Sequence, residues 1–232
     1  MPFTAKSGKF NASINTVEFG TGDKAVKIGG ENVFPLYSFD AAIENAPKVG
    51  IEITDFGMEH EPECIKKYYE GCATLADMAR KAASMEGVDF LSFRMEGGDP
   101  NGANKSTEEL IGELKEIADA VDLPLVVCGC KNVEKDAELF SKAAEALNGK
   151  NAVILSAKEE NYKTVGAAAG LAYKQIVGAE SAVDINLAKQ LNVLISQLGV
   201  DSKSVVMNVG SAAVGYGFEY VISTMDRVKA AG

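Results

Sequence analysis

Apolar residues along this chain gather in short continuous runs, and most of these runs are separated by longer stretches in which apolar residues recur with helical spacing. Short apolar runs are typical of buried parallel strands, and helical stretches between them indicate repeated strand–helix units. On this pattern we predict seven strands, at residues 34–39, 49–54, 90–95, 125–128, 152–156, 175–178 and 204–208.

The stretches between the predicted strands carry the spacing and the end signals of amphipathic helices. Ser106 and Glu109 occupy the two polar positions of a capping box, and apolar residues on one helical face follow them. Two further stretches with the same spacing end at Gly149 and Gly199, which are natural helix C-caps. We therefore expect helices that pack on the sheet.

Residues 15–28 differ from the rest, because apolar residues alternate there on both sides of a glycine-rich turn at residues 20–23. This pattern predicts a β-hairpin, which we expect to plug one end of a barrel. The whole pattern predicts an α/β chain with an N-terminal segment, residues 1–30, that holds the hairpin, and a TIM-type (β/α) barrel over residues 31–232.

Two features depart from an ideal barrel. The link between the first two predicted strands contains Pro47 and is short for a parallel crossover, so its helix is expected to be vestigial. The chain also ends after the helix that follows the seventh predicted strand. We therefore expect a barrel that lacks its last strand–helix unit and has two exposed sheet edges.

Composition and charge narrow the range of partners. The chain is 47% hydrophobic and 24% charged, which is typical of a globular protein. Its formal net charge of -10 repels phosphate backbones and anionic lipids, so we expect neither nucleic acid nor membrane as a partner. The sequence shows no signal peptide at its start and no apolar stretch of membrane-spanning length, so we expect a cytoplasmic protein.

The cysteines and the single histidine offer little chemistry. Cys64, Cys72, Cys128 and Cys130 fit no standard metal-ligand spacing and are too unevenly placed for a disulfide framework. We expect reduced thiols and no metal bound by this chain itself. His60 lies in an acidic loop without a nearby serine or cysteine signature, so we expect it at the surface.

Polar residues follow the C-terminal ends of the predicted strands, where α/β barrels place their functional side chains. Asparagine recurs in these loops and supplies neutral hydrogen-bond donors and acceptors, which suits a ligand rich in amides. The alternative is that each asparagine serves a turn or a helix N-cap. The candidates in these loops are Asp55, Glu96, Asp99, Asn101, Asn132, Glu159, Asn161, Asn186 and Asn208.

A glycine-rich stretch, residues 210–217, follows the seventh predicted strand and leads into a helix. Gly215, Tyr216 and Gly217 lie where backbone amides and a helix N-terminus can meet an anion, and loops in this part of a barrel commonly hold phosphate. The alternative is a tight turn that lets the backbone pack closely.

Catalytic alternatives remain open at this point. The acidic residues Asp55, Glu96, Asp99 and Glu159 are candidates for proton transfer, and the alternative is that they are solvated or cap helices. Lys131 and Lys158 lie near strand ends, where a Schiff-base lysine can sit, although exposed lysines are the ordinary case.

Five sequence blocks together resemble one family, the small subunit of the corrinoid iron-sulfur protein, which is also called the delta subunit of acetyl-CoA decarbonylase/synthase. The resemblance runs in order from about residue 15 to the end of the chain. The blocks lie at residues 26–35, 99–102, 129–138, 184–192 and 215–220.

The resemblance implies a TIM barrel in a heterodimer with a large subunit that carries an iron-sulfur cluster and a mobile corrinoid-binding domain, with a cobalamin held between the two. It implies that the corrinoid relays a methyl group from methyltetrahydrofolate, or a related pterin, to acetyl-CoA synthase in the anaerobic acetyl-CoA (Wood-Ljungdahl) pathway of carbon fixation. A separate methyltransferase delivers that group. The residues that we expect at the cofactor are Asp99, Asn101, Asn132, Glu159, Asn161, Asn186, Asn208, Gly215, Tyr216 and Gly217.

On this interpretation the chain caps and shields the cobalamin and is not catalytic on its own. The alternative is a pterin-dependent corrinoid methyltransferase of the TIM-barrel type, which would bind its folate through residues such as Asp55, Asn101 and Asn186. A third hypothesis is an unrelated barrel lyase that uses Lys131 or Lys158.

Overall fold

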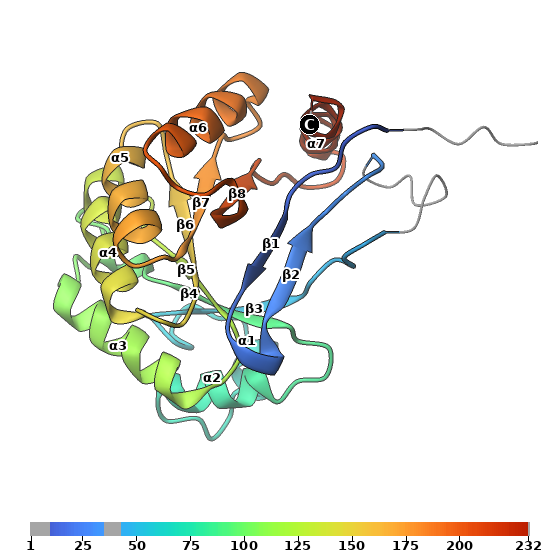
Figure 1. Ribbon diagram of the computed structural model, residues 1–232. Coiled ribbons are helices and arrows are strands. Elements are labelled where there is room, and N and C mark those ends of the chain that lie inside the picture. The colour runs from blue at the N-terminus through green and yellow to red at the C-terminus, as the bar shows by residue number, and fades with distance from the viewer. Residues whose placement is uncertain (1–9, 35–42, 232) are drawn as a thin grey trace, which may run out of the picture.

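Six parallel strands form one sheet in the order in which they occur along the chain. The computed structural model describes residues 10–34 and 43–231, and Figure 1 shows their arrangement. Each strand is short and rich in β-branched or aromatic residues, which favour a buried sheet. The strands are β3 (Gly50–Thr54), β4 (Phe90–Arg94), β5 (Leu125–Cys128), β6 (Val153–Ala157), β7 (Ile176–Glu180) and β8 (Val205–Asn208).

Helices cover one face of this sheet, in an arc that runs from α2 to α6 in Figure 1. Alternate strand residues such as Leu91, Phe93 and Val127 point to that face and pack against fully buried helix residues such as Leu110 and Leu114. The helices are α1 (Glu63–Tyr68), α2 (Leu75–Ala83), α3 (Thr107–Ala120), α4 (Val133–Ala146), α5 (Tyr162–Val165), which a π-helical segment (Gly166–Ala172) continues, α6 (Ile185–Gln197) and α7 (Phe218–Ala231).

The hairpin predicted from residues 15–28 is confirmed, with β1 (Thr16–Phe19) antiparallel to β2 (Val26–Gly29). It packs on the other, helix-free face of the sheet, where its buried Val17, Phe19 and Val26 join strand residues such as Val126 and Ile176 in a second apolar cluster. The Asn151 amide Nδ2, just before β6, donates to the carbonyl oxygens of Glu18 at 3.0 Å and Gly20 at 3.3 Å. The hairpin thus covers the amino-terminal half of that face.

The α/β class and six of the seven predicted strands are confirmed, with ends that differ by at most two residues. The first predicted strand, 34–39, lies almost wholly outside the described residues. A closed barrel is not found: among the strands that the structure describes, β3 and β8 form the two edges of the sheet and do not pair with each other.

The C-terminal helix α7 is tied to the start of the described chain. Lys229 is buried, its ammonium group donates to the Ala12 carbonyl at 2.9 Å, and it lies 4.6 Å from the centroid of the Phe10 ring. The Thr224 hydroxyl donates to the Val183 carbonyl at 3.2 Å, which joins α7 to the segment before α6. Because α7 lies beside the segment that leads into β1 (Figure 1), the two ends of the described chain lie close together.

Candidate functional site

The carboxyl-terminal half of the helix-free face, beyond the part that the hairpin covers, carries polar side chains. Strand register places Glu52 beside Ser92, pairs Arg94 with Cys128, and pairs Glu180 with Asn208, all on this same face. We call this set the polar row; its members are Glu52, Ser92, Arg94, Cys128, Ser156, Lys158, Glu180 and Asn208.

The strongest contact in the polar row is a bidentate ion pair between Arg94 and Glu52. Arg94 Nε donates to Glu52 Oε1 at 2.8 Å and Arg94 NH2 donates to Oε2 at 2.9 Å, which is the fork geometry that suits a carboxylate. The Ser92 hydroxyl adds a bond to Glu52 Oε2 at 3.3 Å and contacts the Cys128 thiol at 3.5 Å. The hydrogen bonds that Arg94 donates to Glu52 raise the pKa of Arg94, and burial raises the pKa of Cys128.

The other end of the polar row holds a looser pair and an amide. Lys158 Nζ lies 3.8 Å from Glu180 Oε1, which is longer than a hydrogen bond, and both side chains are about one third exposed, at 27% and 31%. The Asn208 amide donates to the Ser156 hydroxyl at 3.0 Å, and its Oδ1 accepts from the Gly210 N–H at 3.1 Å. The positive charges of Arg94 and Lys158 therefore balance the negative charges of the two glutamates in the polar row.

Asn208 and Lys158 are the predicted strand-end residues that lie in the polar row. Three other asparagines make local bonds. The side chain of Asn101 donates to Asp99 Oδ1 at 3.3 Å within their own turn, and Asn132 Oδ1 caps α4 by accepting from the Lys135 N–H at 3.0 Å. Asn161 is buried, and its Oδ1 accepts from the Lys158 N–H at 2.8 Å.

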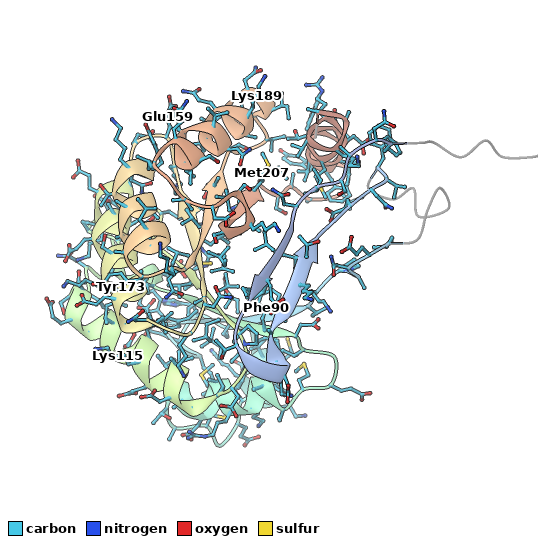
Figure 2. The ribbon with its side chains drawn as sticks, viewed as in Figure 1. Phe90, Lys115, Glu159, Tyr173, Lys189 and Met207 are labelled. Atoms are coloured by element: carbon cyan, nitrogen blue, oxygen red, sulfur yellow. The ribbon has the colours of Figure 1, made fainter. Side chains whose placement is uncertain are left out.

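The remaining predicted cofactor residues are exposed, apart from the half-buried Gly217. Glu159 lies at the outer rim in Figure 2, and Asn186 lies exposed in the first turn of α6. Gly215 and Gly217 have φ values of +78° and +109°, a region that glycine tolerates, and Tyr216 between them is 88% exposed. The N–H groups of Tyr216 and Phe218 both donate to the Ala213 carbonyl, so the turn itself uses these two amides.

Asp55 has a structural role, because it links the end of β3 to the loop between β4 and α3. Its carboxylate is fully buried, forms an ion pair with Lys105 at 3.0 Å, and accepts from the Gly97 N–H at 2.9 Å. Lys105 also binds Glu113 on α3 at 3.2 Å, and burial raises the pKa of that glutamate. A Cβ atom at Gly97 would collide with the Asp55 carboxylate. These contacts hold the loop between β4 and α3, which carries Asp99 and Asn101.

Glu52, Ser92 and Arg94 were not among the predicted site residues, because they lie within their strands and not behind the strand ends. The signal was in the strands: polar residues alternate with apolar ones in Gly50–Thr54 and Phe90–Arg94, so one strand face is polar. His60 is exposed, and its ring meets the Phe56 ring edge-on at 4.8 Å.

Over residues 10–34 and 43–231, no group of three or more His, Cys, Asp or Glu side chains is arranged to hold a metal ion. Among the described helices, none has the length and apolar character needed to cross a membrane.

The fold and the polar row define an α/β protein whose parallel sheet presents a charge-balanced surface at the carboxyl ends of its strands. The chain belongs to the family of CO dehydrogenase/acetyl-CoA synthase delta subunits, whose model matches residues 16–232. This confirms the resemblance seen in the five sequence blocks.

Curated relatives agree with the family. The chain is 31% identical to the acetyl-CoA decarbonylase/synthase complex subunit delta of Methanothermobacter thermautotrophicus, over 96% of this chain and 57% of the relative. It is 31% identical to the same subunit of Methanocaldococcus jannaschii, over 97% and 56% of the two chains, and 30% identical to that of Archaeoglobus fulgidus, over 92% and 47%. The chain thus spans about half the length of the curated relatives it matches.

Proposed function

We propose that this chain is the small, non-catalytic subunit of a corrinoid iron-sulfur methyl carrier in the acetyl-CoA pathway. In this proposal a large subunit with the iron-sulfur cluster pairs with this chain, and a cobalamin lies between the two. The carrier meets a methyltransferase and acetyl-CoA synthase in turn. Family membership supports the pathway, since the curated relatives are named as subunits of the acetyl-CoA decarbonylase/synthase complex.

The observation that carries the proposal is the charge balance of the polar row. Arg94 forms an ion pair with Glu52, and Lys158 faces Glu180. The polar row therefore offers hydrogen bonds while its net charge is zero. A corrin has neutral amide side chains around its rim, and such groups suit a surface of this kind. Asn208, whose amide lies in the same row, adds a further neutral donor. These residues therefore fit the rim of a corrinoid.

The bound corrinoid would supply a cobalt ion that accepts and releases the methyl group. The part of this chain would be to hold the rim and to keep water away from one side of the ring. The hairpin supports that role, because the buried Phe19 and its apolar neighbours cover the amino-terminal half of the same sheet face. The exposed loop residues Glu159, Asn186 and Tyr216 are proposed contacts at the margin of the site.

We also propose that the sheet is the larger arc of a (β/α) barrel. Sequential order, parallel pairing and an outer layer of helices support this, and all three are features of barrels. The barrel mouth would then be the open, carboxyl-terminal side of the polar row.

The alternative of a pterin-dependent methyltransferase has weaker support from the geometry. It would use Asp55 as a folate ligand, and the Asp55 carboxylate is fully buried against Lys105. Saturable binding of methyltetrahydrofolate to the isolated chain, measured by calorimetry, would revive this alternative.

The test is a spectrum of the assembled carrier. The chain and its large partner subunit are mixed under reducing, anaerobic conditions with cobalamin and separated by gel filtration. We expect corrinoid absorption to co-elute with the heterodimer and little of it to elute with this chain alone. A colourless heterodimer would overturn the proposal.

A further inference from the structure

The C-terminal helix α7 is anchored by less apolar packing than α3, a helix of the same length. α3 buries six of its 14 residues, and all of these except Thr107 are apolar. α7 buries three of its 14, namely Val221, Thr224 and Lys229, so Val221 is its single buried apolar residue. Elements with few buried apolar contacts open locally at a low cost in free energy. The position of α7 therefore depends on its polar contacts.

Two polar contacts hold α7 to different parts of the chain. The Lys229 ammonium group donates to the Ala12 carbonyl at 2.9 Å, in the segment that leads into the hairpin. The Thr224 hydroxyl lies 3.2 Å from the Val183 carbonyl, in the loop between β7 and α6. It also lies 2.9 Å from the Tyr220 carbonyl on α7 itself, and its single proton is shared between these two acceptors. α7 thus connects residues 10–12 to the loop after β7.

The loop between β7 and α6 is strained. Ala182 and Val183 follow each other with φ values of +46° and +71°, in the left-handed region that residues with a Cβ atom rarely adopt and that is least favourable for a β-branched residue. The Val183 N–H donates to the Val209 carbonyl at 2.8 Å, which helps to hold this conformation. Such backbone persists only where its surroundings impose it. The loop directly follows Glu180, a member of the polar row.

Two buried polar atoms add to the cost of this arrangement. Among the described residues, Ser181 Oγ in the loop and Asp226 Oδ1 on α7 are buried without a hydrogen-bond partner. A buried polar atom without a partner destabilises the state that buries it. The docked position of α7 therefore combines backbone strain and unpaired polar atoms with little apolar burial, which favours a close balance between two states.

We propose that α7 is a latch with a docked and a released state, and that its docking on residues 10–12 keeps the loop at residues 181–184 in the strained form. In the released state this loop relaxes, so Glu180 at its start can move away from Lys158, which lies 3.8 Å from it when α7 is docked. The segment before the hairpin and the polar row are then coupled through α7, and a change at either one shifts the other. This inference goes beyond the proposed function and requires no corrinoid.

The first test is hydrogen exchange of the backbone amides in the full chain, resolved by residue. Lys229→Met removes the bond to Ala12 and keeps a long side chain. We expect exchange at the amides of Val183 and Asp184 to become about tenfold faster, although these amides lie at the other end of the latch. Arg227→Met, at an exposed position of α7, is the matched control and should leave these rates unchanged.

The second test relieves the strain directly. Glycine adopts positive φ values without a Cβ clash, so Val183→Gly should favour the docked state and slow exchange of the α7 amides by about threefold. Val183→Ala removes most of the same side chain and keeps the unfavourable backbone, so it should not slow this exchange.

Two outcomes would overturn the latch. In one, the faster exchange in Lys229→Met is confined to residues 10–12 and the last turn of α7. In the other, Val183→Gly exchanges as fast as Val183→Ala at the α7 amides. If Lys229→Met does not fold, the comparison of the two Val183 variants decides. Neither outcome bears on the proposed function, because cobalamin is absent from both tests.

Discussion

The two halves of the helix-free sheet face differ sharply. In the amino-terminal half, strand residues such as Val126 and Ile176 are apolar and buried beneath the hairpin. In the carboxyl-terminal half, the same strands present Arg94, Glu180 and Asn208, which the hairpin leaves partly exposed. One set of strands therefore supports the hydrophobic core at one end and a polar surface at the other.

Stability and surface chemistry can therefore be separated along this face. Burying apolar surface lowers the free energy of the folded state at the hairpin end, whereas partly exposed ion pairs contribute little to stability. The polar row can therefore change with small effects on folding, and the hairpin cluster cannot.

The largest effect is expected from Phe19→Ala. Phe19 is 2% exposed and meets the Phe90 ring edge-on at 5.7 Å, beside the hairpin (Figure 2). Its loss leaves a cavity and should lower the free energy of unfolding by about 3 to 5 kcal/mol, measured by urea denaturation. Glu180→Gln, at the other end of the same face, should change it by less than about 1 kcal/mol. Equal effects of the two variants would contradict the contrast.

A second large effect is expected from Lys105→Met. This variant leaves the Asp55 carboxylate buried without its cation, and removing one partner of a buried pair costs about 3 kcal/mol. Urea denaturation measures the loss. Lys189→Met, on the exposed side of α6, is the matched control (Figure 2). A loss no larger than that of the control would mean that the ion pair between Lys105 and Asp55 does not stabilise the fold.

The sequence predicted the fold well because periodicity reports which residues are buried. Apolar runs located β3 to β8, and alternation around a glycine turn located the hairpin. Closure of the sheet could not be predicted, because pairing between distant edges leaves no periodic signal in the chain.

The candidate site was predicted less well. Asparagine serves helix caps and turns as readily as ligands, and only the structure separates Asn132, which caps α4, from Asn208, which faces the polar row. The pairing of Glu52 with Arg94 joins residues 42 positions apart, and the sequence does not encode such a contact locally.

A moderate effect is expected at the N-cap of α4, which is Asn132. Asn132→Ala removes the acceptor for the Lys135 N–H and should lower the free energy of unfolding by about 1 kcal/mol. Asn132→Ser keeps an N-cap oxygen and should restore most of that stability. Both are measured by urea denaturation, and cobalamin binding by the heterodimer is measured in parallel. Weaker binding in both variants with unchanged stability would make Asn132 a ligand rather than a cap.

The smallest effect is a pH dependence at Glu113. Burial raises the pKa of its carboxyl above the ordinary value of 4.5, so the folded state holds this proton more tightly than the unfolded state. The resulting stability is present below that ordinary value and is lost as pH rises through the raised pKa. Glu113→Gln cannot lose a proton, so its stability relative to wild type should increase across that window. Urea denaturation at a series of pH values measures this, with the exposed Glu116→Gln on α3 as control. If the wild type instead becomes more stable relative to Glu113→Gln as the pH rises, the ion pair with Lys105 outweighs burial in its effect on the pKa of Glu113.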